Sequence, residues 1–206
     1  MSKTRLLAAL VALSVLPAVA MAQQTVRVRG VIERADAQTL TVKDRSGEVV
    51  TLVRPADMNV SEVVPLTMAD IKPDSYVGAG AMPQPDGTQR AIEIVVFPEA
   101  SRGTGEGFRP WDMLPESTMT NATVATLAAA PASVPGGQKL VLRYPGGEQT
   151  VIVPPGTPVV TFKPGNHDQA ALVVPGAKVV VTAQVKDGKP TALRLLVGRD
   201  GFAPPM

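Results

Sequence analysis

The chain is 206 residues long, with 20 basic and 18 acidic side chains, no cysteine, one histidine and only 3% aromatic residues. Without cysteine it can form neither disulfides nor thiolate metal sites, and a single histidine excludes catalytic or metal sites that need two. A net charge of +2 also gives no basic surface of the kind that nucleic-acid or acidic-lipid binding requires.

The N-terminus has the pattern of a secretory signal peptide over residues 1–22. Lys3 and Arg5 precede an apolar run over residues 6–16, and small residues form an A-x-A cleavage site before Gln23. That run is too short to span a bilayer, and no later segment is apolar for about 18 residues. We therefore expect export to the periplasm and no membrane span after cleavage. Cleavage would leave 18 basic and 18 acidic residues, hence no net charge.

Alternating apolar and polar residues predict strands after the signal peptide, the first of them over residues 25–33. Residues 68–71 read as one short helical turn, and Pro83–Gly87 as a hairpin turn. Further strands are predicted over residues 39–43, 49–53, 76–82 and 92–96. No segment keeps a helical period over a dozen positions, which indicates an all-β chain.

The second half of the chain repeats the first at a displacement of about 100 residues. Later in the chain the displacement becomes 102 and then 101. Each copy reads as three strands, a short helical or irregular crossing and two more strands. This order is typical of the OB-fold, a small Greek-key barrel, although open sandwiches share the strand count. The aligned identities are Leu40/Leu140, Gly47/Gly147, Glu48/Glu148, Val53/Val153, Pro55/Pro155, Val60/Val160, Pro73/Pro175, Val77/Val179, Asp86/Asp187, Gly87/Gly188, Ala91/Ala192 and Val96/Val197.

We therefore expect two tandem five-stranded OB-like barrels joined by an ordered Gly/Trp loop. The expected boundaries are a signal peptide at 1–22, a first domain at 23–99, an inter-domain segment at 100–121, a second domain at 122–200 and a tail at 201–206. The inter-domain segment holds the only Trp of the chain, Trp111, and also Phe108. We expect these two rings to pack into the seam between the barrels.

The tandem modules and the segment Arg-Gly-Thr-Gly-Glu-Gly-Phe-Arg-Pro-Trp-Asp, residues 102–112, resemble a group of uncharacterised bacterial exported proteins with OB-like domains. The resemblance covers nearly all of the chain after residue 22. Members often carry the label of metal ABC transporter permease, which would require several membrane spans. The resemblance implies the fold and the compartment, and it brings no active site.

The Gly/Trp loop is the candidate binding site. Glycine-spaced backbone can direct N–H groups at an anion, and Trp and Arg are common at binding hot spots. A nucleotide fingerprint is excluded because a proline, not a helix, follows the glycines. The candidate contacts are Arg102, Glu106, Phe108, Arg109, Trp111 and Asp112.

Other chemistries find little support in the sequence. His167 and Asp168 are adjacent but have no second histidine, and the methionines do not cluster, so we expect no metal and no cofactor. Only Tyr144 would offer a base-stacking ring on the barrel strands, which argues against nucleic acid. We expect a non-enzymatic periplasmic module that binds a protein, peptide or small anionic envelope ligand. The alternative is a metal-binding or metal-delivery accessory; a scaffold role and a carboxylate hydrolase also stay open.

Overall fold

The computed structural model of the chain describes residues 25–206. The predicted signal peptide at 1–22 lies outside the described residues. The described chain is all-β: thirteen strands belong to one hydrogen-bonded sheet, and the helical elements are single turns. The predicted all-β class is confirmed.

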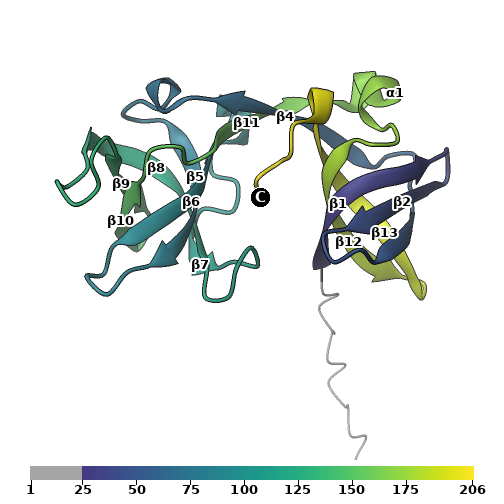
Figure 1. Cartoon of the computed structure of the whole chain (residues 1–206), viewed down its shortest axis with the longest axis horizontal. Coiled ribbons are helices and arrows are strands. Elements are labelled where there is room, and N and C mark those ends of the chain that lie inside the picture. Colours follow the sequence, from purple (N-terminus) through teal and green to yellow (C-terminus); the bar gives the residue numbers. More distant parts are fainter. Residues whose placement is uncertain (1–24) are drawn as a thin grey trace, which may run out of the picture.

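The molecule has two lobes joined by a bridge (Figure 1). The first lobe contains β1 (Thr25–Ala35), β2 (Thr39–Asp44), β3 (Val49–Val53), β12 (Lys178–Lys186) and β13 (Lys189–Gly198). The second lobe contains β5 (Tyr76–Pro83), β6 (Gln89–Val96), β8 (Thr118–Ala129), β9 (Gln138–Tyr144) and β10 (Gly147–Val153), with β7 (Gly107–Pro110) at its edge. The bridge consists of β4 (Asn59–Leu66) and β11 (Val159–Pro164). The helical turns are Met68–Asp70, Glu99–Ser101, Asn166–Asp168, Arg199–Gly201 and the one-turn α1 (Gln169–Leu172).

In each lobe the strand pairing closes into a circuit of five strands. In the first lobe, β1 pairs with β2 and β12, β2 with β3, β12 with β13, and β3 with β13 in parallel. In the second lobe, β8 pairs with β9 and β5, β9 with β10, β5 with β6, and β10 with β6 in parallel. Closure leaves few free strand edges in either lobe.

Each circuit combines strands from both halves of the chain. The first lobe takes three strands from residues 25–53 and two from 178–198, and the second takes strands from 76–96 and 118–153. The expected domains at 23–99 and 122–200 do not match this pairing, because the last two strands of each copy complete the other copy's circuit. The expected boundary at residue 121 also falls inside β8.

The bridge explains the exchange of strands. Between the third and fourth strands of each copy only a short helical or irregular crossing was expected. The helical turn at Met68–Asp70 is present, but it is preceded by the extended strand β4. The β-branched residues Val60, Val63 and Val64 favour extended backbone, and β4 pairs antiparallel with its counterpart β11 from Val159 to Pro164. An extended segment carries the chain away from the circuit it has just left. Both copies therefore cross to the opposite lobe.

The repeat seen in the sequence reappears in the strand registers. The β1–β2 pairing shifts register between Ile32 and Arg34, and the β8–β9 pairing shifts between Val124 and Thr126. The β12–β13 and β5–β6 ladders also shift at equivalent places, after Thr182 and after Gly80. Bulges at matched positions are features of a shared design, so the two lobes are equivalent strand by strand.

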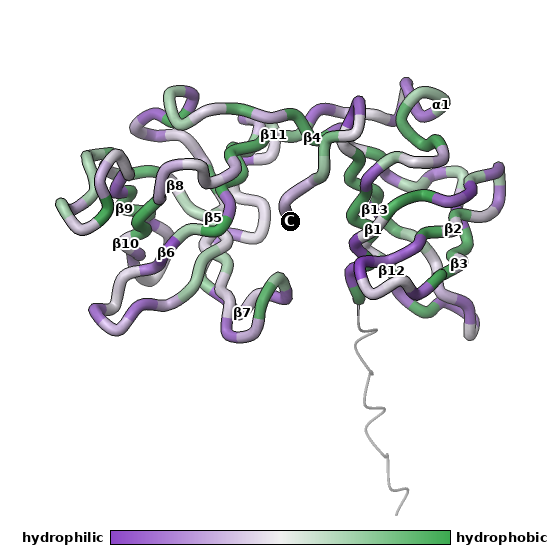
Figure 2. The backbone as a smooth tube through the Cα atoms, in the orientation of Figure 1, coloured by the Kyte–Doolittle hydropathy of each residue, from purple (hydrophilic) through white to green (hydrophobic). Residues whose placement is uncertain are grey.

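Each lobe encloses its own apolar core, and a third cluster fills the seam. Leu40 and Leu195 are completely buried in the first lobe, and Ile94 and Leu140 in the second. Hydrophobic residues recur along the strands of both lobes (Figure 2). The third cluster lies beside the bridge, and its buried residues are Val63, Val95, Val160, Val180, Leu196 and Met206.

Candidate functional site

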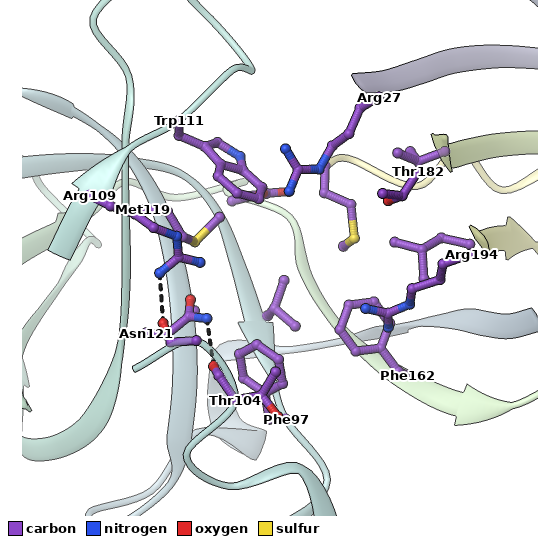
Figure 3. A pocket seen from close by; sticks show the side chains of 17 residues that line it. Arg27, Phe97, Thr104, Arg109, Trp111, Met119, Asn121, Phe162, Thr182 and Arg194 are labelled. Carbon is purple, nitrogen blue, oxygen red and sulfur yellow. Dashed lines mark hydrogen bonds between the residues drawn. The ribbon is translucent and has the colours of Figure 1, made fainter. Parts of the chain in front are cut away.

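A cavity of about 220 Å³ lies between the two lobes. Figure 3 shows Trp111, Arg109 and Asn121 on one side of it and Arg27 and Arg194 on the other. Its size is just below the roughly 300–1,000 Å³ of sites for drug-sized ligands, so it suits a smaller molecule. Its lining residues are Arg27, Gly78, Glu93, Val95, Phe97, Thr104, Gly105, Arg109, Trp111, Met119, Asn121, Phe162, Val180, Thr182, Arg194, Leu196 and Met206.

Trp111 connects the lobes at this cavity. It follows β7, and its ring lies 4.1 Å from the guanidinium carbon of Arg27 on β1 and 5.5 Å from that of Arg109. A guanidinium over an indole face is stabilised by the ring quadrupole. The expected packing of Trp111 into the seam is confirmed. The same expectation for Phe108 is wrong, because this ring is 42% exposed. Phe108 is next to Arg109 on β7, Arg109 lines the cavity, and neighbouring positions of an extended strand point to opposite faces.

Asp112 adds a charged contact beside the ring of Trp111. Its carboxylate lies 3.2 Å from Nη1 of Arg27 and 2.9 Å from Nη2 of Arg29, both on β1. Partial burial acts to raise the pKa of Asp112, but the hydrogen bond from Arg29 and the charges of Arg27 and Arg29 hold it below its ordinary range. The Gly/Trp loop of the second lobe is therefore fastened to the first lobe.

The loop between Arg102 and Glu106 is held against the second lobe. Asn121 Nδ2 on β8 donates to the carbonyl oxygen of Thr104 at 2.9 Å, and Arg109 Nη1 on β7 donates to that of Gly105 at 2.7 Å (Figure 3). Gly105 has a φ of +56°, and a Cβ here would lie 3.2 Å from Nδ2 of Asn121. A glycine thus lets the backbone approach the cavity.

Glu93 is the most unusual group of the cavity wall. It lies on β6, its side chain is fully buried, and neither carboxylate oxygen has a hydrogen-bond partner among the described residues. Burial raises the pKa of Glu93 to about 7; the positive charges of Arg29 and Arg27 oppose the rise, and Asp112 adds to it. A buried carboxyl without donors costs free energy, and perturbed acids in cavities often mark functional sites.

Positive charge is crowded around the same space. Burial, and then the charge of Arg27, lower the pKa of Arg194 on β13. Burial and the charge of Arg27 also lower the pKa of Arg109. The guanidinium of Arg194 lies 5.0 Å from the ring centre of Phe162, on the bridge strand β11. Arg27 thus repels both Arg109 and Arg194, and cations crowded in this way among apolar neighbours favour an anion between them.

Several buried polar atoms at the cavity have no partner among the described residues. They are Trp111 Nε1, Arg194 Nε, Asn121 Oδ1 and both carboxylate oxygens of Glu93. Native proteins leave few buried polar groups unpaired, and each exception calls for an explanation. Their concentration in one small cavity is typical of a binding site that a ligand or water completes.

The structure brings together only part of the predicted site. Arg109 and Trp111 line the cavity, and Asp112 lies beside it. Glu106 borders a separate open groove, and Phe108 points away. Arg102 is committed elsewhere: its Nε lies 2.6 Å from a carboxylate oxygen of Glu99, and its Nη2 donates to the carbonyl of Asp74.

The sequence reasoning missed Glu93, Asn121, Arg27 and Arg194. Glu93 alternates with Ile92 and Ile94 in the sequence. Such a pattern predicts a strand with one buried face, and it places Glu93 on the face toward solvent. In the structure Glu93 and Val95 are buried as well, because this second face of β6 looks into the seam, whereas Ala91 lies in the core of the second lobe on the other side of a register shift. A run such as Ala-Ile-Glu-Ile-Val-Val is typical of a strand buried on both faces, and this signal was available.

Within residues 25–206, no group of three or more His, Cys, Asp or Glu side chains is placed to hold a metal ion. No helix in that part of the chain is both long and apolar enough to cross a bilayer.

Similarity to known proteins does not identify this site. We found no match to the chain among protein-family models, among curated proteins or among solved structures. The functional argument therefore depends on the geometry of the cavity between the lobes.

Proposed function

We propose that the protein is a non-enzymatic binding module of the periplasm, and that its ligand is a small anion with an apolar part. The compartment is proposed from the signal pattern of residues 1–22. We further propose that each lobe is an OB-like Greek-key barrel completed by strand exchange. The support for this is a closed five-stranded circuit in which the third and last strands run parallel.

One observation carries the proposal for the ligand. The arginines Arg27, Arg109 and Arg194 meet apolar walls and unpartnered polar atoms in one cavity, although they come from β1, β7 and β13. Arginine binds carboxylate and phosphate groups through its fork of donors. The rings of Phe97 and Phe162 and the neighbouring aliphatic side chains offer contact to an apolar part.

The experiment uses Trp111 as a reporter, because it is the only Trp of the chain and lines the cavity. The probes are phenyl phosphate and 3-phenylpropanoate, with neutral 3-phenylpropanamide for comparison, in fluorescence titration and calorimetry. We expect saturable binding of the two anions and weaker binding of the amide. Arg194→Gln removes a charge-assisted contact of about 1.5–3 kcal/mol and so weakens anion binding roughly tenfold or more.

Arg90→Gln is the matched control, since Arg90 is an exposed arginine of β6 outside the cavity lining. It should leave the affinity unchanged. The proposal fails if neither anion binds saturably, or if Arg194→Gln and Arg90→Gln bind 3-phenylpropanoate as tightly as the unchanged protein does.

A further inference from the structure

The duplicated positions around the cavity carry complementary chemistry. Gly80 pairs with Glu93 in the β5–β6 ladder, and the equivalent pair in the β12–β13 ladder is Thr182 with Arg194. An acid in one copy thus stands where a cation stands in the other. Elsewhere in the repeat, equivalent core positions of the strands carry similar side chains. The change of charge is therefore a feature of the cavity and not of the fold as a whole.

A second pair of equivalent positions differs in the same sense. Gly78 on β5 pairs with Asn121 on β8, and the equivalent pair in the first lobe is Val180 with Arg29. Asn121 presents an unpartnered amide oxygen, whereas Arg29 is a cation bound to Asp112. β6 and β8 of the second lobe therefore offer acceptors to the cavity, whereas the first lobe, with Arg27 and Arg194, offers cationic donors.

Glycines in β5 make room for these acceptors. A Cβ at Gly80 would lie 2.8 Å from Cγ of Glu93, and one at Gly78 would lie 2.8 Å from Oδ1 of Asn121. Any larger residue would displace these two side chains. Two glycines at alternate positions of β5 thus leave room for a carboxylate and an amide oxygen that have no donor among the described residues.

We propose that the ligand is an apolar carboxylic acid that also carries an amino or hydroxyl group, as an amino acid or a hydroxy acid does. Its carboxylate would meet Arg27 and Arg194, and its N–H or O–H group would meet Glu93 and Asn121. This rests on the proposed function, whose probes need only a negative charge and an apolar part. The added donor satisfies acceptors that otherwise stay buried and unpaired.

The pKa of Glu93, raised to about 7 by burial, fits this role. The charged groups that face Glu93 are Arg27 and Arg29 from β1 and Asp112 from the loop after β7, and Arg109 and Arg194 share its cavity. Near neutral pH the carboxyl changes readily between a form that accepts from an ammonium group and a form that also donates.

Three acids with one skeleton test the proposal: 3-phenylpropanoate has no donor, 3-phenyllactate has a hydroxyl group and phenylalanine has an ammonium group. Affinities are measured by calorimetry and by Trp111 fluorescence at pH 7.5. We expect at least one donor-bearing acid to bind about tenfold more tightly than 3-phenylpropanoate. Glu93→Leu should abolish that preference, so that the three acids bind with similar affinities, because the variant lacks the acceptor for the added N–H or O–H group.

Two further variants sharpen the result. Glu93→Gln keeps an acceptor without charge, so a preference that depends on the ammonium group should fall while one that depends on the hydroxyl group should persist. Glu33→Leu, at an exposed position of β1, is the control and should change nothing.

The experimental results that would overturn the proposed function differ from those that would overturn this inference. If all three acids bind equally to the unchanged protein, the binding function stands, water satisfies Glu93 and this inference is wrong. The inference is also wrong if Glu93→Leu retains the preference. If none of the three acids binds, this inference fails, and the proposed function fails with it unless phenyl phosphate binds.

Discussion

The two lobes of this molecule share a strand plan but differ where they face each other. Ile94 and Leu195 occupy equivalent, completely buried positions in their cores, and bulges fall at matched points of the ladders. At the seam, Glu93 in one lobe stands where Arg194 stands in the other. Core positions of a repeat are constrained by packing, which is the same in both copies. Positions where the two lobes face each other can differ, because each side chain there meets a side chain of the other copy.

The largest expected effect comes from the shared cores. Ile94→Ala and Leu195→Ala each remove a fully buried aliphatic side chain and should lower the free energy of unfolding by about 2–5 kcal/mol. Because each lobe contains strands of both halves, either substitution should shift one common transition in urea. Circular dichroism and Trp111 fluorescence should give coincident curves. Two separate transitions, each moved by only one substitution, would show that the lobes are independent.

The next effect is the pH dependence caused by Glu93. Its pKa is about 7 in the folded protein against 4.5 ordinarily, so the folded state holds this proton more tightly. The stabilisation is fully present below about pH 4.5 and is lost as pH rises to about 7, a change of roughly 3 kcal/mol. Glu93→Gln cannot ionise, so its stability relative to the unchanged protein should increase over this interval.

Urea unfolding of both proteins at pH 4.5, 6 and 8 measures that difference directly. Other titrating groups act equally on the two proteins and cancel in the comparison. A difference that is constant with pH would contradict the burial of an uncompensated carboxyl at position 93.

Substitution of the two aromatic rings of the Gly/Trp loop should lower the free energy of unfolding by smaller and unequal amounts. Trp111→Leu removes the stacking with Arg27 and Arg109, at a cost of about 1–2 kcal/mol. Phe108→Leu should cost less than about 0.5 kcal/mol, because the Phe108 ring is largely exposed. Thermal unfolding followed by circular dichroism compares the two, since fluorescence is lost with Trp111. Equal costs would mean that Trp111 does not fasten the lobes together.

The smallest effect is expected at Asp112. Asp112→Asn weakens the ion pairs to Arg27 and Arg29, and partly exposed pairs contribute about 0.2–1 kcal/mol each. The loss should shrink in about 1 M salt, where exposed charges are screened. A loss that stays the same at both ionic strengths would show that packing, not charge, holds this loop to β1.

Local pattern was sufficient for the elements and for the repeat. Alternation at Val26, Val28 and Ile32 predicted β1, and the displacement of about 100 residues predicted the equivalence of the β2–β3 and β9–β10 hairpins. Their registers differ by one residue, because Leu40 faces Leu52 whereas Leu140 faces Val151 and not the aligned Ile152. These features depend on neighbours in sequence and on the period of a strand. Trp111 was found for a related reason, because a rare aromatic residue outside the repeated strands needs a place to pack.

The exchange of strands was decided by tertiary structure. The hydrophobic faces of these strands could be buried equally well in a circuit closed within one copy or in a circuit closed across both copies. Only the extended course of β4 and β11 selects closure across both copies. The burial of Glu93 follows from that choice, because it exists only where two lobes meet. The amino-acid pattern determined which residues form strands and which halves are alike. The pairing of distant strands determined the partners and the cavity, since contacts between strands far apart in the chain leave no local period in the sequence.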